Sequence, residues 1–247
     1  MKKYWLFAIA LISILTTAQA QPAAGADSTG GFEWGPGLKV LIVAGGFGHD
    51  FNTWDNKFDT DLLGKAGITS VHYTEDPTVA ARELPHADVL LVSNNHMGFD
   101  TPPFRQAVTN FIASDKGIVM LHSATFYAWK WVEWYSNYVG AGARGHDGAS
   151  PFTEVILKDH PVTHGLPPSF AVTDELYHIE PFQGGSPMEI LGEAVRGDGQ
   201  KYPSIWLVPS AGKARVICIA LGHDGFPRQS PEFLTLLTNA VKWAGHQ

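Results

Sequence analysis

Cysteine is almost absent from this sequence, since Cys218 is the only one among 247 residues. One cysteine cannot form a disulfide within the chain, so stability must come from a hydrophobic core, which a chain of this length can build. Cys218 lies inside the apolar run 216–221, where we expect a buried thiol. Charged residues are also sparse, at 17% of the chain against 45% hydrophobic residues, which is typical of a globular protein.

No apolar run is long enough to span a bilayer. The first one, residues 5–15, has eleven residues, whereas a membrane-spanning helix needs about 20. It follows the positively charged Lys2 and Lys3 and is followed by a small-residue cleavage motif that ends at Ala20, a pattern typical of a secretory signal peptide. We therefore predict a signal peptide over residues 1–20, cleaved after Ala20, with no membrane span after cleavage and a periplasmic or secreted product.

Positive charge is scarce: 17 Lys and Arg stand against 24 Asp and Glu, a formal net charge of −7. Cleavage after residue 20 would remove two lysines and leave 227 residues with 15 basic and 24 acidic side chains, a net charge of −9. Nucleic acid and anionic lipid surfaces are unfavourable partners for such a chain. We expect a neutral or small ligand, and Gln21 in place of a cysteine argues against a lipid anchor.

The usual local motifs for phosphate and zinc are missing too. No Gly-x-Gly-x-x-Gly motif opens a predicted helix, and Gly-x-x-x-x-Gly-Lys-Ser/Thr does not occur, so we expect no bound nucleotide. Neither a His-Glu-x-x-His motif nor a cysteine cluster marks a zinc site. Metal binding stays open, because histidines on separate loops can still coordinate an ion.

Short apolar runs alternate with segments of helical periodicity, which predicts an α/β fold with right-handed crossovers. Nearly continuous apolar runs are typical of strands covered on both faces, so we expect a mainly parallel central sheet with helices on both faces, in three layers. The predicted strands are residues 38–44, 68–74, 87–93, 117–122, 152–157, 188–194, 204–208 and 214–220. The predicted helices are residues 54–66, 78–84, 102–114 and 231–244. We expect residues 21–37 to be a flexible lead-in and residues 38–247 to form a single domain.

Three histidines follow predicted strands. His49 comes after the first strand, His122 ends the fourth, and His223 follows the last. In open α/β sheets, ligands bind beyond the carboxyl ends of the strands, where such residues meet. Each histidine alone is better explained as a hydrogen-bonded structural residue, but three at one edge favour a shared site, and the same three could bind a divalent metal.

Further polar candidates lie in segments that we expect to be loops. His146 stands beside Asp147 after a glycine-rich stretch, and Glu175 belongs to the sequence Asp-Glu-Leu-Tyr-His. A solvated loop carboxylate is an equally good interpretation of Glu175.

Aromatic residues are concentrated in residues 126–138, which include Trp129, Trp131 and Trp134. They could belong to the core, but we favour the stacking wall of a carbohydrate pocket, because apolar sugar faces stack on indole rings. The polar partners expected for the sugar hydroxyls are Asn94, Asn95 and Asp224.

Several blocks of this sequence resemble the signature blocks of the ThuA-like, or trehalose-utilisation, family, in the family's order over about 200 residues. They are Gly-Gly-Phe-Gly-His-Asp-Phe (45–51), Leu-His-Ser-Ala-Thr (121–125), His-Pro-Val-Thr-His-Gly-Leu-Pro (160–167), Asp-Glu-Leu-Tyr (174–177), Gly-Lys-Ala-Arg-Val (212–216) and Ala-Leu-Gly-His-Asp (220–224). That family is similar in fold to the class I glutamine amidotransferases. The resemblance places His122 at the position of their nucleophilic cysteine, so a thioester mechanism is excluded. Ser123 is not in a Gly-x-Ser-x-Gly motif, which argues against a serine hydrolase.

The resemblance implies carbohydrate metabolism through 3-keto sugars. Our leading hypothesis is an exported lyase or hydrolase acting on a keto-glycoside, disaccharide or related sugar, by elimination, hydration or hydrolysis. The expected site residues are His49, His122, His146, Glu175, His223 and Asp224. A non-catalytic carbohydrate-binding protein and an accessory subunit of a sugar oxidoreductase system are the alternatives.

Within this site we expect His122 to be the base or a metal ligand. His49 and His223 would be co-ligands or acid partners, with Asp50 or Asp224 orienting an imidazole. Glu175 would be a second acid or base.

Overall fold

One nine-stranded sheet runs through the part of the chain that the structure describes, residues 31–209 and 212–247 of a computed structural model. The strand order is β2-β1-β3-β4-β9-β8-β7-β5-β6. The strands are β1 (Lys39–Gly45), β2 (Ser70–Thr74), β3 (Val89–Asn94), β4 (Gly117–Leu121), β5 (Ala141–Ile156), β6 (Ser169–Pro181), β7 (Glu189–Val195), β8 (Lys201–Leu207) and β9 (Val216–Ile219). The predicted signal peptide, residues 1–20, lies outside the described residues.

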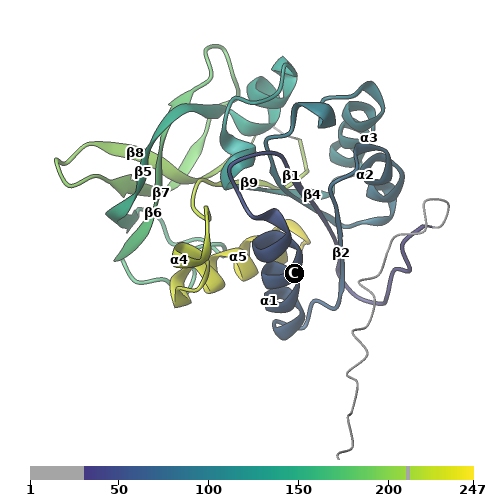
Figure 1. The fold of residues 1–247 in the computed structure, drawn as a ribbon, viewed down its shortest axis with the longest axis horizontal. Helices are drawn as coiled ribbons and strands as arrows, with labels where there is room; N and C mark the ends of the chain where they lie inside the picture. Colours follow the sequence, from purple (N-terminus) through teal and green to yellow (C-terminus); the bar gives the residue numbers. More distant parts are fainter. Residues whose placement is uncertain (1–30, 210–211) are drawn as a thin grey trace, which may run out of the picture. The chain divides into compact units, whose positions relative to one another are not determined.

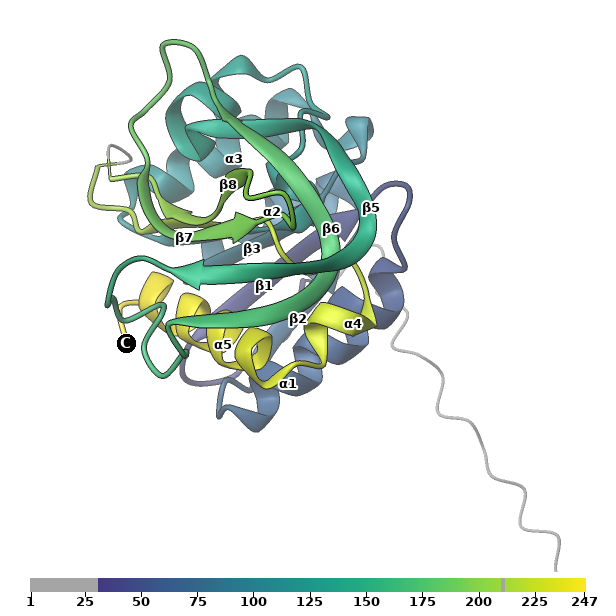
Figure 2. The same ribbon diagram turned by 90° about the vertical axis from the view of Figure 1, so that its left-hand side faces the viewer.

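The sheet is mixed, which corrects the prediction of a mainly parallel one. Strands β2, β1, β3, β4 and β9 pair in parallel, whereas β8, β7, β5 and β6 continue the sheet in antiparallel pairs. No helix separates β5, β6, β7 and β8 in the chain, so none of the connections between them provides the helical crossover that parallel neighbours normally need. Figure 2 shows β5 and β6 as two long curved strands in front of the rest of the sheet.

Helices cover both faces of the parallel part. They are α1 (Thr60–Lys65), which continues the π-helical segment η1 (Asn52–Asp59), α2 (Pro77–Glu83), α3 (Pro102–Ala113), the short α4 (Gly225–Arg228) and α5 (Pro231–Ala244). Helices α2 and α3 lie together on one side, and α1 and α5 lie together on the other (Figure 1). Helices α3 and α5 each begin with a proline in the first turn. Their N-terminal N–H groups are capped by the side chains of Thr101 in α3 and Ser230 in α5.

The side chains of each central strand alternate between two cores, because successive residues of a strand point to opposite faces. Leu41 and Val43 of β1 pack in the core that includes α2 and α3, while Val40 and Ile42 pack in the core that includes α1 and α5. Both sets are fully buried, which explains why the sequence of this strand is continuously apolar.

Part of the expected flexible lead-in is tied to the domain. Gly31–Gln247 form one compact unit, and the rings of Phe32 and Trp34 pack against the core. The backbone N–H of Phe32 and the indole N–H of Trp34 both donate to Glu83, each at 3.2 Å. Residues 31–37 thus lack regular structure but are anchored by specific contacts. None of the described helices has both the length and the apolar character that crossing a membrane would require.

Candidate metal centre

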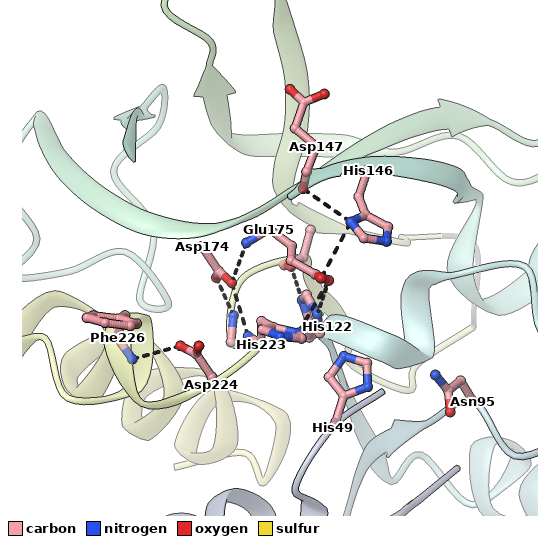
Figure 3. A network of polar contacts seen from close by, with 12 residues as sticks. His49, Asn95, His122, His146, Asp147, Asp174, Glu175, His223, Asp224 and Phe226 are labelled. Carbon is pink, nitrogen blue, oxygen red and sulfur yellow. Dashed lines mark hydrogen bonds and ion pairs between the residues drawn. The ribbon is translucent and has the colours of Figure 1, made fainter. Parts of the chain in front are cut away.

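Four side chains from four separate segments meet beyond the carboxyl ends of the parallel strands (Figure 3). His49 follows β1, His122 follows β4, His223 follows β9, and Glu175 comes from β6. Each offers one nitrogen or oxygen atom, and these four atoms all lie within 4.8 Å of one another. We call this set the histidine–glutamate cluster. The structure thus brings together the three histidines that the strand-end argument selected and adds Glu175 to them.

His122 occupies a strained position at the end of β4. Its φ is 41°, a left-handed conformation that costs a non-glycine residue about 1–3 kcal/mol and is found mostly at functional sites. Its Nδ1 donates to the Ala220 carbonyl at 2.8 Å, so Nδ1 carries the hydrogen and Nε2 presents a lone pair to the cluster. Burial lowers the pKa of His122, which keeps the ring neutral.

A glycine turn aims His49 into the same space. Gly46 has a φ of 132°, and a Cβ there would lie 1.8 Å from the side-chain oxygen of Asn95, so only glycine fits. Asn95 accepts the Phe47 N–H at 2.9 Å and donates to the Phe47 carbonyl at 3.0 Å. His49 Nδ1 donates to the same carbonyl at 2.9 Å, which leaves Nε2 facing the cluster. Burial, followed by the neighbouring His122, lowers the pKa of His49 to about 4.

Two buried side chains, Asp174 and Arg228, hold the loop that carries His223, and burial raises the pKa of Asp174 to about 7. The carboxylate of Asp174 accepts the N–H of Gly222 at 2.6 Å and that of His223 at 3.1 Å. Arg228 donates through Nε to the Gly222 carbonyl at 2.8 Å and is itself paired with two acidic residues of η1, Asp55 and Asp59. In the sequence, Asp174 stood out only as the neighbour of Glu175. Its hydrogen bond with Gly222 joins residues 48 positions apart, so no local sequence pattern indicates it.

Glu175 lies at the centre of the imidazoles, in a strand rather than in a solvated loop. Its Oε2 is 3.5 Å from His122 Nε2 and 3.3 Å from His223 Nδ1, and its Oε1 is 3.5 Å from His146 Nδ1. Burial acts to raise the pKa of Glu175, and His122, His223 and His146 lower it when they carry a proton toward it; the net direction is below its ordinary value. Glu175 is therefore a carboxylate at neutral pH.

Three imidazole nitrogens of the cluster are buried and have no hydrogen-bond partner: His49 Nε2, His122 Nε2 and His223 Nδ1. Buried polar atoms are normally satisfied, and the lone pairs at His49 Nε2 and His122 Nε2 are repelled by a nearby carboxylate unless a cation lies between them. Metal ligands about 2 Å from an ion lie roughly 3–4 Å apart, close to the separations here. Nitrogen and carboxylate donors suit zinc and similar divalent metals.

His146 lies next to the cluster in β5 and its side chain is 38% exposed. Its Nδ1 lies 3.1 Å from the Asp147 carbonyl and 3.5 Å from Glu175, and both neighbours are oxygens. Nδ1 therefore carries the hydrogen, and Nε2 is free to accept a proton from a bound molecule.

The remaining expected site residues have other contacts. Asp224 accepts the Phe226 N–H at 2.8 Å and Asp50 accepts the Thr53 N–H at 3.0 Å, so each caps a helical segment and neither contacts an imidazole. Asn94 donates to the Ala44 carbonyl, and Asn95 is fully engaged by Phe47. Both asparagines are buried and hydrogen-bonded within the protein, and Asp224 caps α4, so the binding of sugar hydroxyls by Asn94, Asn95 and Asp224 stays a prediction.

The predicted aromatic wall is wrong. Trp129, Trp131 and Trp134 are 7%, 4% and 1% exposed and belong to the core on the α3 side of the sheet. Their rings contact one another and Phe104 of α3, so they offer no open face for stacking. Only Phe126 of this stretch reaches the site, where its ring centroid is 6.4 Å from that of His146.

The fold is that of an α/β protein of the class I glutamine amidotransferase type, and His122 follows its strand β4. Solved structures of that type include a GMP synthase subunit from Thermoplasma acidophilum (TM-score 0.56, 11% identity, 85% of this chain and 94% of the other) and a glutamine amidotransferase from Thermotoga maritima (TM-score 0.52, 10% identity, 85% and 99%). Cys218 is no substitute nucleophile, because it is buried in β9 and burial raises the pKa of its thiol.

The chain belongs to the ThuA family, described as trehalose utilisation, whose family model matches residues 39–244. Similar solved structures are ThuA-like proteins from Parabacteroides merdae (TM-score 0.73, 19% identity, 84% of this chain and 90% of the other) and Bacteroides uniformis (TM-score 0.67, 20% identity, 91% and 95%). A search of curated proteins found no match. The family membership points to a carbohydrate-related function.

Proposed function

We propose that this protein is an exported, metal-dependent enzyme that acts on a keto-glycoside or a related sugar. The family supports the carbohydrate, and the histidine–glutamate cluster supports the metal. Lys2, Lys3 and the apolar run that follows them support export.

The observation that carries the proposal is the set of three unpartnered, buried imidazole nitrogens around one carboxylate. A protein that only binds a neutral sugar has no need to bury four titratable side chains against one another at a strained backbone position. His122 in particular has a φ of 41°, and such strained non-glycine positions are concentrated at functional sites.

Elimination from a 3-keto-glycoside fits these residues. The ketone at C3 makes the proton at C2 acidic, so a base can remove it and form an enolate. The C1–O bond then breaks, its electron pair leaves with the aglycone oxygen, and that oxygen takes up a proton. The products are a 1,2-unsaturated 3-keto sugar and an alcohol, and hydration is the reverse type of step. No oxidant or reductant is consumed.

His146 is the base that we assign to the C2 proton. Its Nε2 is free, and Glu175, 3.5 Å from Nδ1, would stabilise the imidazolium that forms. The imidazolium can then return the proton to the leaving oxygen. His49, His122, His223 and Glu175 would hold a divalent metal, which supplies Lewis-acid stabilisation of the enolate oxygen when it is bound.

Metal analysis and turnover test this proposal. The purified mature protein should bind one equivalent of Zn²⁺ or Co²⁺ and should release the alcohol from a 3-keto-glucoside. His122→Ala should abolish both, whereas His178→Ala, a control in the same strand as Glu175 but paired with Asp147, should keep both. A folded His122→Ala variant with wild-type turnover would refute the assignment, and saturable sugar binding without product would favour a binding protein.

A further inference from the structure

Arg228 is one of the largest fully buried side chains of the described residues, although arginine is almost never buried in this way unless it is paired. Its guanidinium donates through Nε to the Gly222 carbonyl at 2.8 Å, through Nη2 to Asp55 at 3.0 Å, and through Nη1 to Asp59. The two aspartates are 1% and 0% exposed. We call the arginine and these two aspartates the buried triad.

The buried triad joins two of the segments that build the histidine–glutamate cluster. Gly222 directly precedes His223, and η1, which carries both aspartates, begins three residues after His49. The ring centroids of the two histidines lie 4.7 Å apart, but their buried nitrogens, His49 Nε2 and His223 Nδ1, have no hydrogen-bond partner among the described residues. The two rings therefore do not hold each other in place, and contacts behind them must set their separation.

Stability alone is a poor explanation of the buried triad. The cost of removing an arginine and an acid from water offsets much of their attraction, so apolar side chains of similar volume often give equal or higher stability. This cost is visible at Asp59, because burial raises its pKa to about 7 despite the guanidinium beside it, and its Oδ1 is buried without a partner. What arginine offers over an apolar side chain is a planar set of donors that fixes several partners in one geometry.

We propose that Arg228 is a positioning residue, which fixes the separation of His49 and His223 through the buried triad. This inference rests on the proposed function and deepens it, because that separation decides whether both imidazoles can bind one ion. Distances from a metal to its ligands vary by only about 0.2 Å, so a small displacement of either loop weakens binding. In this role Arg228 contacts neither the ion nor the substrate.

An apolar variant tests the inference: Arg228→Met together with Asp55→Leu and Asp59→Leu. Its midpoint of urea unfolding should equal or exceed that of wild type, because no buried charge is left without a partner. It should nevertheless bind Co²⁺ about 10–100-fold more weakly, as is typical when residues that orient metal ligands are replaced. The visible absorption of the bound ion should change as well.

NMR of the histidine rings gives a second readout that needs no metal. In the apolar variant the ring signals of His49 and His223 should both shift, whereas the signal of His178 should stay unchanged. The matched control is Arg105→Met with Asp100→Leu, which removes an Arg–Asp pair at α3 that contacts no residue of the cluster. This control should change neither the cobalt affinity nor the three ring signals.

Unshifted ring signals in a folded apolar variant would overturn the inference. So would equal cobalt affinity of wild type and variant when wild type binds the ion. If the apolar variant does not fold, Arg228→Lys decides in its place: it keeps the charge, but its single nitrogen cannot reproduce the planar set of donors, so it should also weaken cobalt binding and shift both ring signals. If wild type binds no Co²⁺ while both ring signals shift, the metal centre fails and the positioning role stands.

Discussion

Asp174 should control the geometry of the candidate metal centre without binding the metal. It lies next to Glu175 in β6 and accepts the N–H groups of Gly222 and His223 at 2.6 and 3.1 Å, as well as that of Glu175 at 2.8 Å. One carboxylate therefore connects two of the four cluster segments. In Asp174→Asn, one oxygen becomes an NH₂ group that faces N–H donors, so at least one buried donor loses its partner.

The size of the effect follows from these contacts. Burial raises the pKa of Asp174 to about 7, so the group is partly ionised at neutral pH. A hydrogen bond contributes about 0.5–1.5 kcal/mol to a neutral group and about 1.5–3 kcal/mol to a charged one, and an unsatisfied buried donor costs about 1–3 kcal/mol. Residues that orient metal ligands typically change affinity by about 10–100-fold when replaced. We expect Asp174→Asn to weaken Co²⁺ binding by that factor and to change the visible absorption of the bound ion, because His223 is displaced.

Cobalt titration followed by absorption, with urea unfolding of the same samples, separates positioning from stability. Glu154→Gln is the matched control: Glu154 is also a fully buried acid of the sheet, accepts the Ser204 hydroxyl, and has no contact with the cluster. Its pKa is raised to about 8, so the substitution hardly changes the charge at neutral pH. Wild-type cobalt affinity and spectrum in Asp174→Asn, or equal losses in both variants, would refute the positioning role.

Two further predictions concern stability and export. Burial raises the pKa of Glu154 from 4.5 to about 8, so the unfolded chain releases this proton at lower pH than the folded chain does. The free energy of unfolding therefore decreases as the pH rises from 4.5 to about 8. Urea unfolding should show Glu154→Gln gaining on wild type by roughly 1.4 kcal/mol per pH unit from pH 5 to 8; parallel curves would contradict this. For export, the mature protein isolated from a cell fraction outside the cytoplasm should begin at Gln21 on N-terminal sequencing, and a chain that keeps residue 1 would contradict cleavage.

The parallel half of the fold could be predicted because its signals are local. The strand expected at residues 87–93 is β3, Val89–Asn94, and the helix expected at 231–244 is α5, Pro231–Ala244. A continuous apolar run, a helical spacing of apolar residues and a proline at a helix start can each be recognised within a short stretch of sequence. The antiparallel half was harder to predict from the sequence. The residues of β6 were expected to form a loop, because they do not show a clear alternation of apolar and polar residues.

The sequence by itself determined the family, the strand ends and the three histidines placed there, since parallel strands bring their carboxyl ends to one edge. The sequence also offered Glu175, His146 and Asp224 as candidates, and only the tertiary structure decided that Glu175 joins the histidines while Asp224 caps α4. Glu175 faces the imidazoles because β5 and β6 curve across that edge, and Asp174 holds the His223 loop through a contact between distant segments. The tertiary structure also determined which aromatic side chains are buried: the tryptophans of residues 126–138 lie in the core, whereas Phe47 and Phe226 face solvent. Pairing and burial depend on residues far apart in the chain, so no local pattern could reveal them.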